Sequence, residues 1–172
     1  MSVNVSALQF QHTRFFESLQ AVLEETGLHP TLLELELTER TVMEGGEHIV
    51  DLLRRIKSLG VSLSLDDFGT GYCSLSYLKH FPIDTLKIDR AFIRDVAWDN
   101  DSAAIVGAIV AMGKGMNKHV LAEGVETVDQ ADFLTSTGCS QMQGFLFGKA
   151  MSSREFEERI AAIDLGDPRV AP

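Results

Sequence analysis

Carboxylates, amides and one lysine follow short apolar segments at intervals along this chain. The strand pattern over residues 61–65 leads into the adjacent carboxylates Asp66 and Asp67. Two neighbouring carboxylates repel each other unless a cation lies between them, and such oxygen ligands suit a pair of hard divalent ions. An acidic turn that caps the next helix is the alternative interpretation. The tripeptide 67–69 also matches the magnesium motif of kinases, but no His-Arg-Asp loop or glycine-rich phosphate loop precedes it, which excludes a kinase.

Lys87 is a second candidate, because Leu86 and Ile88 flank it with apolar side chains. A lysine directed into a protein core must pair with an acid or have a lowered pKa. A structural salt bridge to Asp84 or Asp89 would meet this need. A Schiff-base nucleophile and a cation that orients a water or phosphate oxygen are the functional alternatives.

Four further residues are ambiguous when each is taken alone. Glu36 and Glu39 are three residues apart, so Glu36 could point into the fold while Glu39 holds neighbouring backbone or begins a helix. Asn4 could be a metal ligand or a hydrogen-bonded buried amide. Glu123 could serve as a metal ligand or base, or as an acidic helix start.

The elements that must position these residues alternate between strand and helix. Strand patterns occupy residues 2–6, 33–38, 61–65, 85–88, 119–122 and 142–147. Helical patterns occupy residues 47–59, 103–116 and 125–134, and another ends before Gly27. Gly60 and Gly138 follow two of these helices as expected for helix ends. Asp101 or Ser102 can cap the helix over 103–116. This alternation predicts a mainly parallel sheet covered by helices, either as an open doubly wound sheet or as a (β/α) barrel.

Two features favour the barrel. Residues 33–37 alternate leucine with glutamate, whereas a central strand of an open parallel sheet is apolar on both faces. The candidate residues also follow successive strands, and barrel enzymes place their chemistry at these strand ends. About six strand–helix units are present instead of eight, so we predict an incomplete TIM-like (β/α) barrel of the α/β class. Five oxygen-bearing residues and one lysine at its mouth fit a two-metal phosphoester site better than a Schiff-base pocket.

Composition narrows the function classes. The 172 residues include 15 Lys and Arg against 25 Asp and Glu, giving a net charge of −10 that disfavours polymeric nucleic acid and anionic membranes as partners. The apolar stretch over residues 103–112 is too short to span a bilayer, and no signal peptide is visible. Cys73 and Cys139 lack Cys-x-x-Cys spacing, which favours a reduced, cytoplasmic protein.

The chain resembles the EAL-domain family, bacterial phosphodiesterases that cut cyclic-di-GMP to linear pGpG with Mg²⁺ or Mn²⁺. Six segments in the same order carry the resemblance: Val3-Asn4-Val5-Ser6, Glu36-Leu37-Thr38-Glu39, Asp66-Asp67-Phe68-Gly69-Thr70-Gly71, Leu86-Lys87-Ile88-Asp89-Arg90, Ala122-Glu123-Gly124-Val125-Glu126-Thr127 and Gln143-Gly144-Phe145-Leu146-Phe147-Gly148.

The resemblance implies a role for each matching residue. Asn4, Glu36, Asp66, Asp67 and Glu123 correspond to ligands of a two-metal site that holds Mg²⁺ or Mn²⁺. Lys87 corresponds to the lysine that orients the hydrolytic water, and Glu123 also to a general base. Gln143 corresponds to a substrate contact, and Glu39 to the residue that steadies the loop after Asp67.

The resemblance also has gaps. Cys73, Lys149 and Ala150 replace residues common in the family, and no Glu-Ala-Leu tripeptide precedes Asn4. We therefore expect an EAL-like domain over residues 1–164, truncated at its N-terminal side and without one metal-ligand glutamate, and a C-terminal tail over 165–172. The isolated chain should be weakly active or inactive.

The implied ligand is cyclic-di-GMP, hydrolysed by a complete domain. An inactive module for cyclic-di-GMP binding or protein interaction is the alternative. We expect association with a second copy or with other domains of a longer signalling protein, because an open barrel leaves strand edges unpaired.

Overall fold

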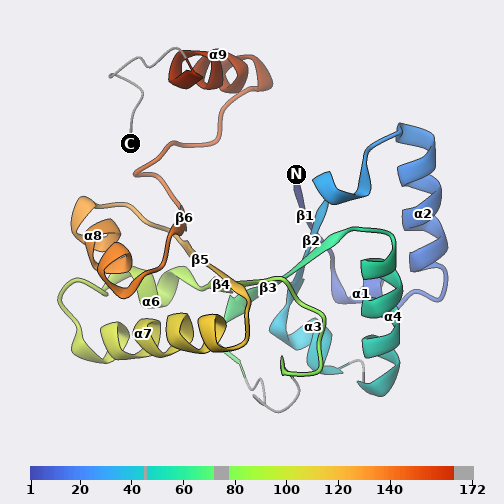
Figure 1. Ribbon diagram of the computed structural model, residues 1–172, viewed down its shortest axis with the longest axis horizontal. Coiled ribbons are helices and arrows are strands. Elements are labelled where there is room, and N and C mark those ends of the chain that lie inside the picture. Colours follow the sequence, from blue (N-terminus) through green and yellow to red (C-terminus); the bar gives the residue numbers. More distant parts are fainter. Residues whose placement is uncertain (45, 72–77, 165–172) are drawn as a thin grey trace.

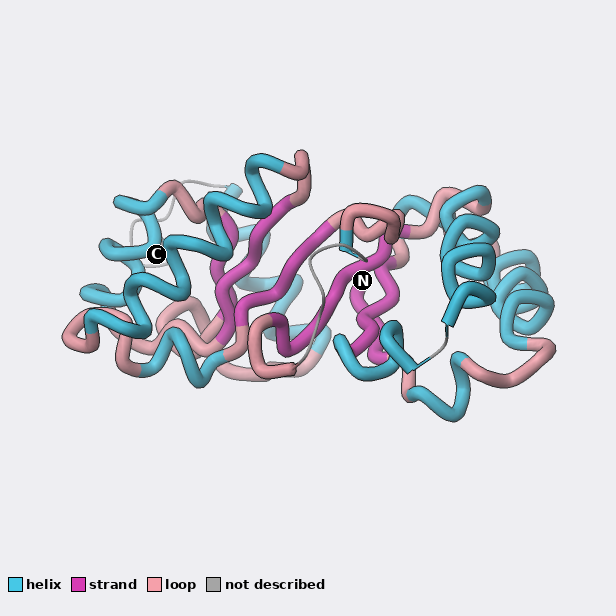
Figure 2. The backbone as a smooth tube through the Cα atoms, turned by 90° about the horizontal axis from the view of Figure 1, so that it is seen from below, coloured by secondary structure: helices cyan, strands magenta, loops and turns pink. Residues whose placement is uncertain are grey.

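The computed structural model describes residues 1–44, 46–71 and 78–164, so Cys73 and the tail over 165–172 lie outside the described residues. Its centre is one parallel sheet with the strand order of the sequence. The strands are β1 (Ser2–Asn4), β2 (Glu34–Thr38), β3 (Ser62–Phe68), β4 (Thr85–Ile88), β5 (His119–Glu123) and β6 (Gln141–Gln143). The sheet curls into half of a barrel with helices between the strands (Figures 1 and 2), which confirms the incomplete TIM-like fold.

Helices connect the strands and cover the outer face of the sheet. They are α1 (Ala7–Phe10), α2 (Phe15–Thr26), the 3₁₀ turn η1 (Pro30–Leu32), α3 (Glu39–Glu44), α4 (Gly46–Ser58), α6 (Arg90–Arg94), α7 (Asn100–Gly115), α8 (Val128–Thr137) and α9 (Ser153–Asp164). The helices α1 to α4 accompany the first three strands and α6 to α8 the last three, whereas α9 stands apart from the sheet (Figure 1). No helix in the described ranges is both long enough and apolar enough to cross a membrane.

The two faces of the sheet differ in chemistry, as the alternation in residues 33–37 predicts. Leu35 and Leu37 of β2 are buried in the core under the helices, together with Leu63 and Leu65 of β3. Successive strand residues point to opposite faces, so the intervening residues point into the barrel. Glu36 pairs in register with both Asn4 and Ser64, which places these polar side chains on the same inner face.

The last predicted strand is shorter than expected, since β6 ends at Gln143 and not at residue 147. The chain turns there, because the Leu146 N–H donates to the Val125 carbonyl at 3.0 Å. A Cβ on Gly144 would lie 2.1 Å from that carbonyl oxygen, so the turn packs directly on the backbone of Val125. Local β-propensity could not reveal this contact between segments about twenty residues apart.

Two helix starts also differ from the expectation. The Asp99 side chain, and not Asp101 or Ser102, caps α7 by accepting the Ser102 N–H at 2.8 Å. The helix expected over 125–134 begins at Val128 with Thr127 as its cap, because residues before it continue the loop after β5.

Candidate metal centre

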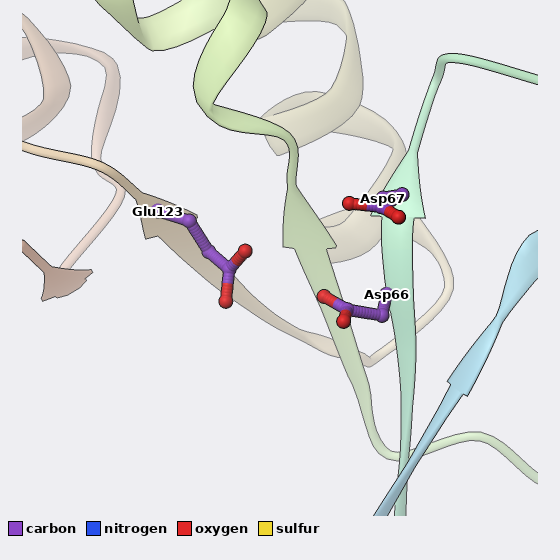
Figure 3. A group of neighbouring side chains, drawn as sticks. All are labelled: Asp66, Asp67 and Glu123. Atoms are coloured by element: carbon purple, nitrogen blue, oxygen red, sulfur yellow. The ribbon is translucent and has the colours of Figure 1, made fainter. Parts of the chain in front are cut away.

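Three carboxylates from two strands converge at the carboxyl end of the sheet. Asp66 and Asp67 lie on β3 and Glu123 lies on β5, with β4 between these strands (Figure 3). Among the described residues, each of the three offers an oxygen within 4.8 Å of the oxygens of the other two. This spacing is short enough for one cation to contact all three side chains.

An irregularity in β3 brings the two adjacent aspartates to the same site. In a regular strand, Asp66 and Asp67 would point to opposite faces of the sheet. The pairing between β3 and β4 shifts register between Leu65 and Phe68, and Asp67 has a φ of 54°. A bulge of this kind redirects a side chain, and here both aspartates face Glu123.

Lys87 reaches the same group of acids from β4. Its Nζ atom lies 2.8 Å from Glu36 Oε2, 3.0 Å from Asp66 Oδ1 and 2.7 Å from Glu123 Oε1. The lysine side chain is 5% exposed, so these ion pairs are shielded from water. Burial opposes the charged form, but hydrogen bonds with Glu123, Glu36 and Asp66 outweigh it and raise the Lys87 pKa.

The salt-bridge partners considered for Lys87 from the sequence are wrong. Asp84 instead pairs with Lys57, at 2.7 Å, and accepts the Leu63 N–H at the opposite end of the strands. Asp89 caps α6 by accepting the Ala91 N–H at 2.6 Å. Lys87 pairs with residues of other strands and not with its neighbours in the sequence, because it shares the inner face of the sheet with Glu36, Asp66 and Glu123.

The carboxylates carry an excess of negative charge. Partial burial, a hydrogen bond with Asp89 and the charges of nearby acids raise the pKa of Asp67 to about 6. Burial also raises the pKa of Glu123, although Lys87 opposes this effect. Lys87 supplies one positive charge beside the carboxylates of Glu36, Asp66, Asp67 and Glu123, so a further cation would be stabilised here.

Asp89 is the member of this cluster that sequence reasoning did not assign to the site. Its carboxyl caps α6, and its proximity to Asp67 contributes to the raised pKa of that residue. Its position directly after β4 was the available signal, because strand ends converge at the mouth of a barrel.

Asn4 and Gln143 lie on either side of this cluster. Asn4 is exposed on β1, in register with Glu36, and Gln143 is exposed on β6, in register with Glu123. Both therefore share the inner face of the sheet with the charged residues. They stand at its two outer strands, outside the group of three converging carboxylates.

Glu39 both begins a helix and contacts the backbone of a neighbouring loop, so the two alternatives considered for it hold together. It begins α3, and its Oε2 atom accepts the Gly69 N–H at 3.4 Å. A Cβ on Gly71 would lie 2.7 Å from the other carboxylate oxygen. The Glu39 carboxylate therefore lies against the loop that follows Asp67 and makes one hydrogen bond to it.

A protein-family model described as the EAL domain matches residues 1–150. The chain belongs to the EAL-domain family. It is 47% identical over 161 residues to the bifunctional diguanylate cyclase/cyclic di-GMP phosphodiesterase MucR of Pseudomonas aeruginosa, an alignment covering 94% of this chain and 24% of MucR. The EAL-domain chain thus spans about a quarter of that relative's length.

Solved EAL-domain structures share the fold. A cyclic di-GMP complex of the MucR phosphodiesterase superposes with a TM-score of 0.87 and 48% identity, covering 90% of this chain and 63% of that one. A manganese and cyclic di-GMP complex of Klebsiella pneumoniae BlrP1 gives a TM-score of 0.79 and 32% identity, covering 86% of this chain and 38% of that one.

Proposed function

We propose that this EAL chain carries most of the site of a metal-dependent phosphodiesterase that hydrolyses cyclic-di-GMP to linear pGpG as part of a complete domain. The observation that carries the proposal is the convergence of Asp66, Asp67 and Glu123 within 4.8 Å beside Lys87. The relatives support it, because MucR is named in part as a cyclic di-GMP phosphodiesterase and BlrP1 was solved with manganese and cyclic di-GMP.

The residues of the site fit a divalent cation. Carboxylate oxygens are the ligands that Mg²⁺ and Mn²⁺ prefer. Burial, with a smaller effect of neighbouring acids, raises the pKa values of Asp67 and Glu123, so a bound cation would stabilise their charged forms. We assign Asp66, Asp67 and Glu123 to the metals, with Glu36 and Asn4 as neighbouring ligands. When bound, the metals would polarise the phosphoester and lower the pKa of the attacking water.

The chain's own residues would position the substrate and the water. The three N–H donors of Lys87 contact Glu36, Asp66 and Glu123. When metals take up these carboxylates, the ammonium would be released to orient a water or a phosphate oxygen. Glu123 has a raised pKa, which suits a residue that accepts a proton from that water. Gln143 would contact the substrate at the edge of the site, and Glu39 would keep the loop after Asp67 in place.

A Schiff-base mechanism is disfavoured by the same geometry. It needs a neutral amine, whereas three carboxylates raise the pKa of Lys87. The remaining alternative is a module that binds cyclic-di-GMP or a protein without cleaving it, since the 172 residues contain no Glu-Ala-Leu tripeptide. Our proposal also includes an EAL-like domain over 1–164, a separate tail over 165–172, a cytoplasmic location and association with a second copy.

Calorimetry with Mn²⁺ tests the site on this chain. Asp66→Asn and Asp67→Asn each remove one anionic ligand with little change in shape, so each should abolish measurable binding. Asp51→Asn, an exposed aspartate on α4, removes the same charge elsewhere and should bind as the parent does. Equal affinity in all four proteins would refute the site.

Product analysis tests the activity. A complete domain, made by joining the leading part of the MucR phosphodiesterase to this chain, should convert cyclic-di-GMP to pGpG. Hydrolysis that disappears in Asp66→Asn supports the enzyme. Nucleotide binding without product supports the inactive module instead.

A further inference from the structure

Gln130 is a buried polar residue outside the candidate metal centre. It lies in the first turn of α8 and is 3% exposed. Its side-chain Oε1 atom accepts the backbone N–H groups of Glu126 and Thr127, at 2.7 and 3.0 Å. The backbone N–H of Gln130 donates to the Thr127 hydroxyl at 3.3 Å. These bonds form a capping box that closes the start of the helix.

The other end of the Gln130 amide serves a different element. Its Nε2 group donates to the Arg94 carbonyl at 3.1 Å, at the last residue of α6. A Cβ on Gly124 would lie 2.6 Å from Cβ of Arg90, the first residue of α6. The segment from Gly124 to Gln130 therefore contacts both the first and the last residue of α6.

These contacts connect the segments that carry two parts of the site. The loop begins directly after Glu123 of β5, and α6 begins two residues after Ile88, which ends β4 and follows Lys87. Towards β6 the loop is held by backbone atoms, with the Val125 N–H donating to the Gln143 carbonyl at 3.0 Å. Towards β4 it is held by the side chain of Gln130.

We propose that Gln130 is a positioning residue that sets Glu123 against Lys87 and the β3 aspartates; this inference rests on the proposed metal site. The Oε1 side of the amide organises the loop after Glu123. The Nε2 side ties that loop to the helix after β4. A helix cap alone needs only the first of these functions, which makes the two roles separable.

Gln130→Glu separates them, because a carboxylate still accepts the two loop N–H groups but cannot donate to the Arg94 carbonyl. We expect its Mn²⁺ affinity to fall about tenfold, the lower end of the effect of residues that orient metal ligands. Gln130→Met, which is neutral, should show a similar loss. Its inclusion keeps the test valid if a buried carboxylate prevents folding.

Two controls report what a cap alone contributes. Thr127→Val removes the hydroxyl of the same capping box while sparing the bond to Arg94. Gln9→Met disrupts another capping box, at α1, where Gln9 pairs with Ser6 on an exposed surface. Both variants should keep the parent's Mn²⁺ affinity, whatever their melting temperatures.

Calorimetry with Mn²⁺ and thermal melts on the five proteins decide the question. Loss of affinity confined to the Gln130 variants, at temperatures where all are folded, supports the inference. Parent-like affinity in Gln130→Glu, or an equal loss in Thr127→Val, would overturn it. If the parent itself fails to bind Mn²⁺, the proposed metal site fails, which is a separate result.

Discussion

At the scale of single residues, Lys87 shows how this fold handles a buried charge. Its ammonium contacts carboxylates from three strands while its side chain is 5% exposed. A buried cation of this kind is costly to remove, because its partners then remain as unpaired buried anions. The candidate site and the stability of the metal-free protein thus depend on the same side chain.

The first prediction concerns the charge of Lys87. Lys87→Met should lower the free energy of unfolding of the metal-free chain by about 3 kcal/mol, the usual effect of breaking a buried ion pair. Saturating Mn²⁺ should recover part of this loss, because a cation restores positive charge among Glu36, Asp66 and Glu123. Urea denaturation with and without Mn²⁺ measures both effects.

Lys57→Met is the matched control for this experiment. It removes a lysine paired with Asp84 at the other end of the sheet. We expect its stability loss to be smaller and insensitive to Mn²⁺. An identical loss in Lys87→Met at all Mn²⁺ concentrations would show that Lys87 does not share its partners with a cation.

The second prediction concerns pH. The folded-state pKa of Asp67 is raised to about 6 from an ordinary value of 3.8, so the folded chain binds more protons than the unfolded chain between these values. Stability of the metal-free protein should therefore fall as pH rises through this window, and Glu123, whose pKa is also raised, acts in the same direction. Thermal melts between pH 5 and 7 measure the slope.

Asp67→Asn isolates the contribution of that side chain. The variant cannot titrate at position 67, so its melting temperature should change less with pH than that of the parent. The lowered pKa values of Asp95 and Asp99 act below their ordinary value of 3.8, outside this window. Parallel pH profiles for parent and variant would contradict a raised Asp67 pKa.

At the scale of elements, two loops that follow strands contain a glycine that lies very close to another segment of the chain. Gly144 packs on the backbone of Val125, and Gly71 packs against the carboxylate of Glu39. Each contact joins segments that are distant in sequence and adjacent at the barrel mouth. The strands determine the direction in which the site side chains point, and these contacts determine the position of the loops that follow the strands.

The third prediction tests the Glu39 contact. A methyl group at Gly71 would lie 2.7 Å from Glu39 Oε1, so Gly71→Ala should displace this carboxylate from the Gly69 N–H. We expect a loss of about 1 kcal/mol in the free energy of unfolding, as for one lost hydrogen bond, and weaker Mn²⁺ binding. Chemical denaturation and calorimetry measure the two quantities.

Gly107→Ala provides the control for this substitution. Gly107 lies within α7, and a Cβ there meets no atom within 4 Å. Alanine at this unobstructed, half-buried position in a helix interior should stabilise the protein by about 0.5–1 kcal/mol. If both glycine variants changed stability in the same direction, the Glu39 contact would not be restrictive.

At the scale of the whole molecule, the half-barrel leaves a large apolar groove away from the carboxylates. A groove of about 1020 Å³ runs between β1, α1 and α2, lined mainly by apolar side chains. Val3 on β1, Leu8 on α1 and Val22 on α2 are 40%, 86% and 54% exposed. Exposed apolar surface beside an unpaired strand edge favours association.

The fourth prediction is that the chain associates with a second copy through this groove. Light scattering should show a mean mass that rises with protein concentration. Leu8→Lys should reduce association, because a charge on the groove must otherwise be buried. Val128→Lys, on the exposed surface of α8, should leave it unchanged. A parent that stays monodisperse and monomeric would contradict the prediction.

Much of the fold is readable from local patterns. The alternation of leucine and glutamate in residues 33–37 predicts a strand with one polar face, and β2 has that form. Gly27 and Gly138 mark helix ends, and both occupy the left-handed region that terminates a helix. Side chains a few residues apart determine these features, so the linear order of residues is sufficient to predict them.

Contacts between distant segments decide the geometry of the site. The bulge that turns Asp66 and Asp67 to the same side, the three ion pairs of Lys87 and the effect of Asp89 on the pKa of Asp67 all depend on contacts between strands. The residue types alone identify the candidates, because a carboxylate or a lysine is rarely buried unless it is paired or binds a metal. Their distances and protonation follow from strand register and burial, which arise when the sheet assembles.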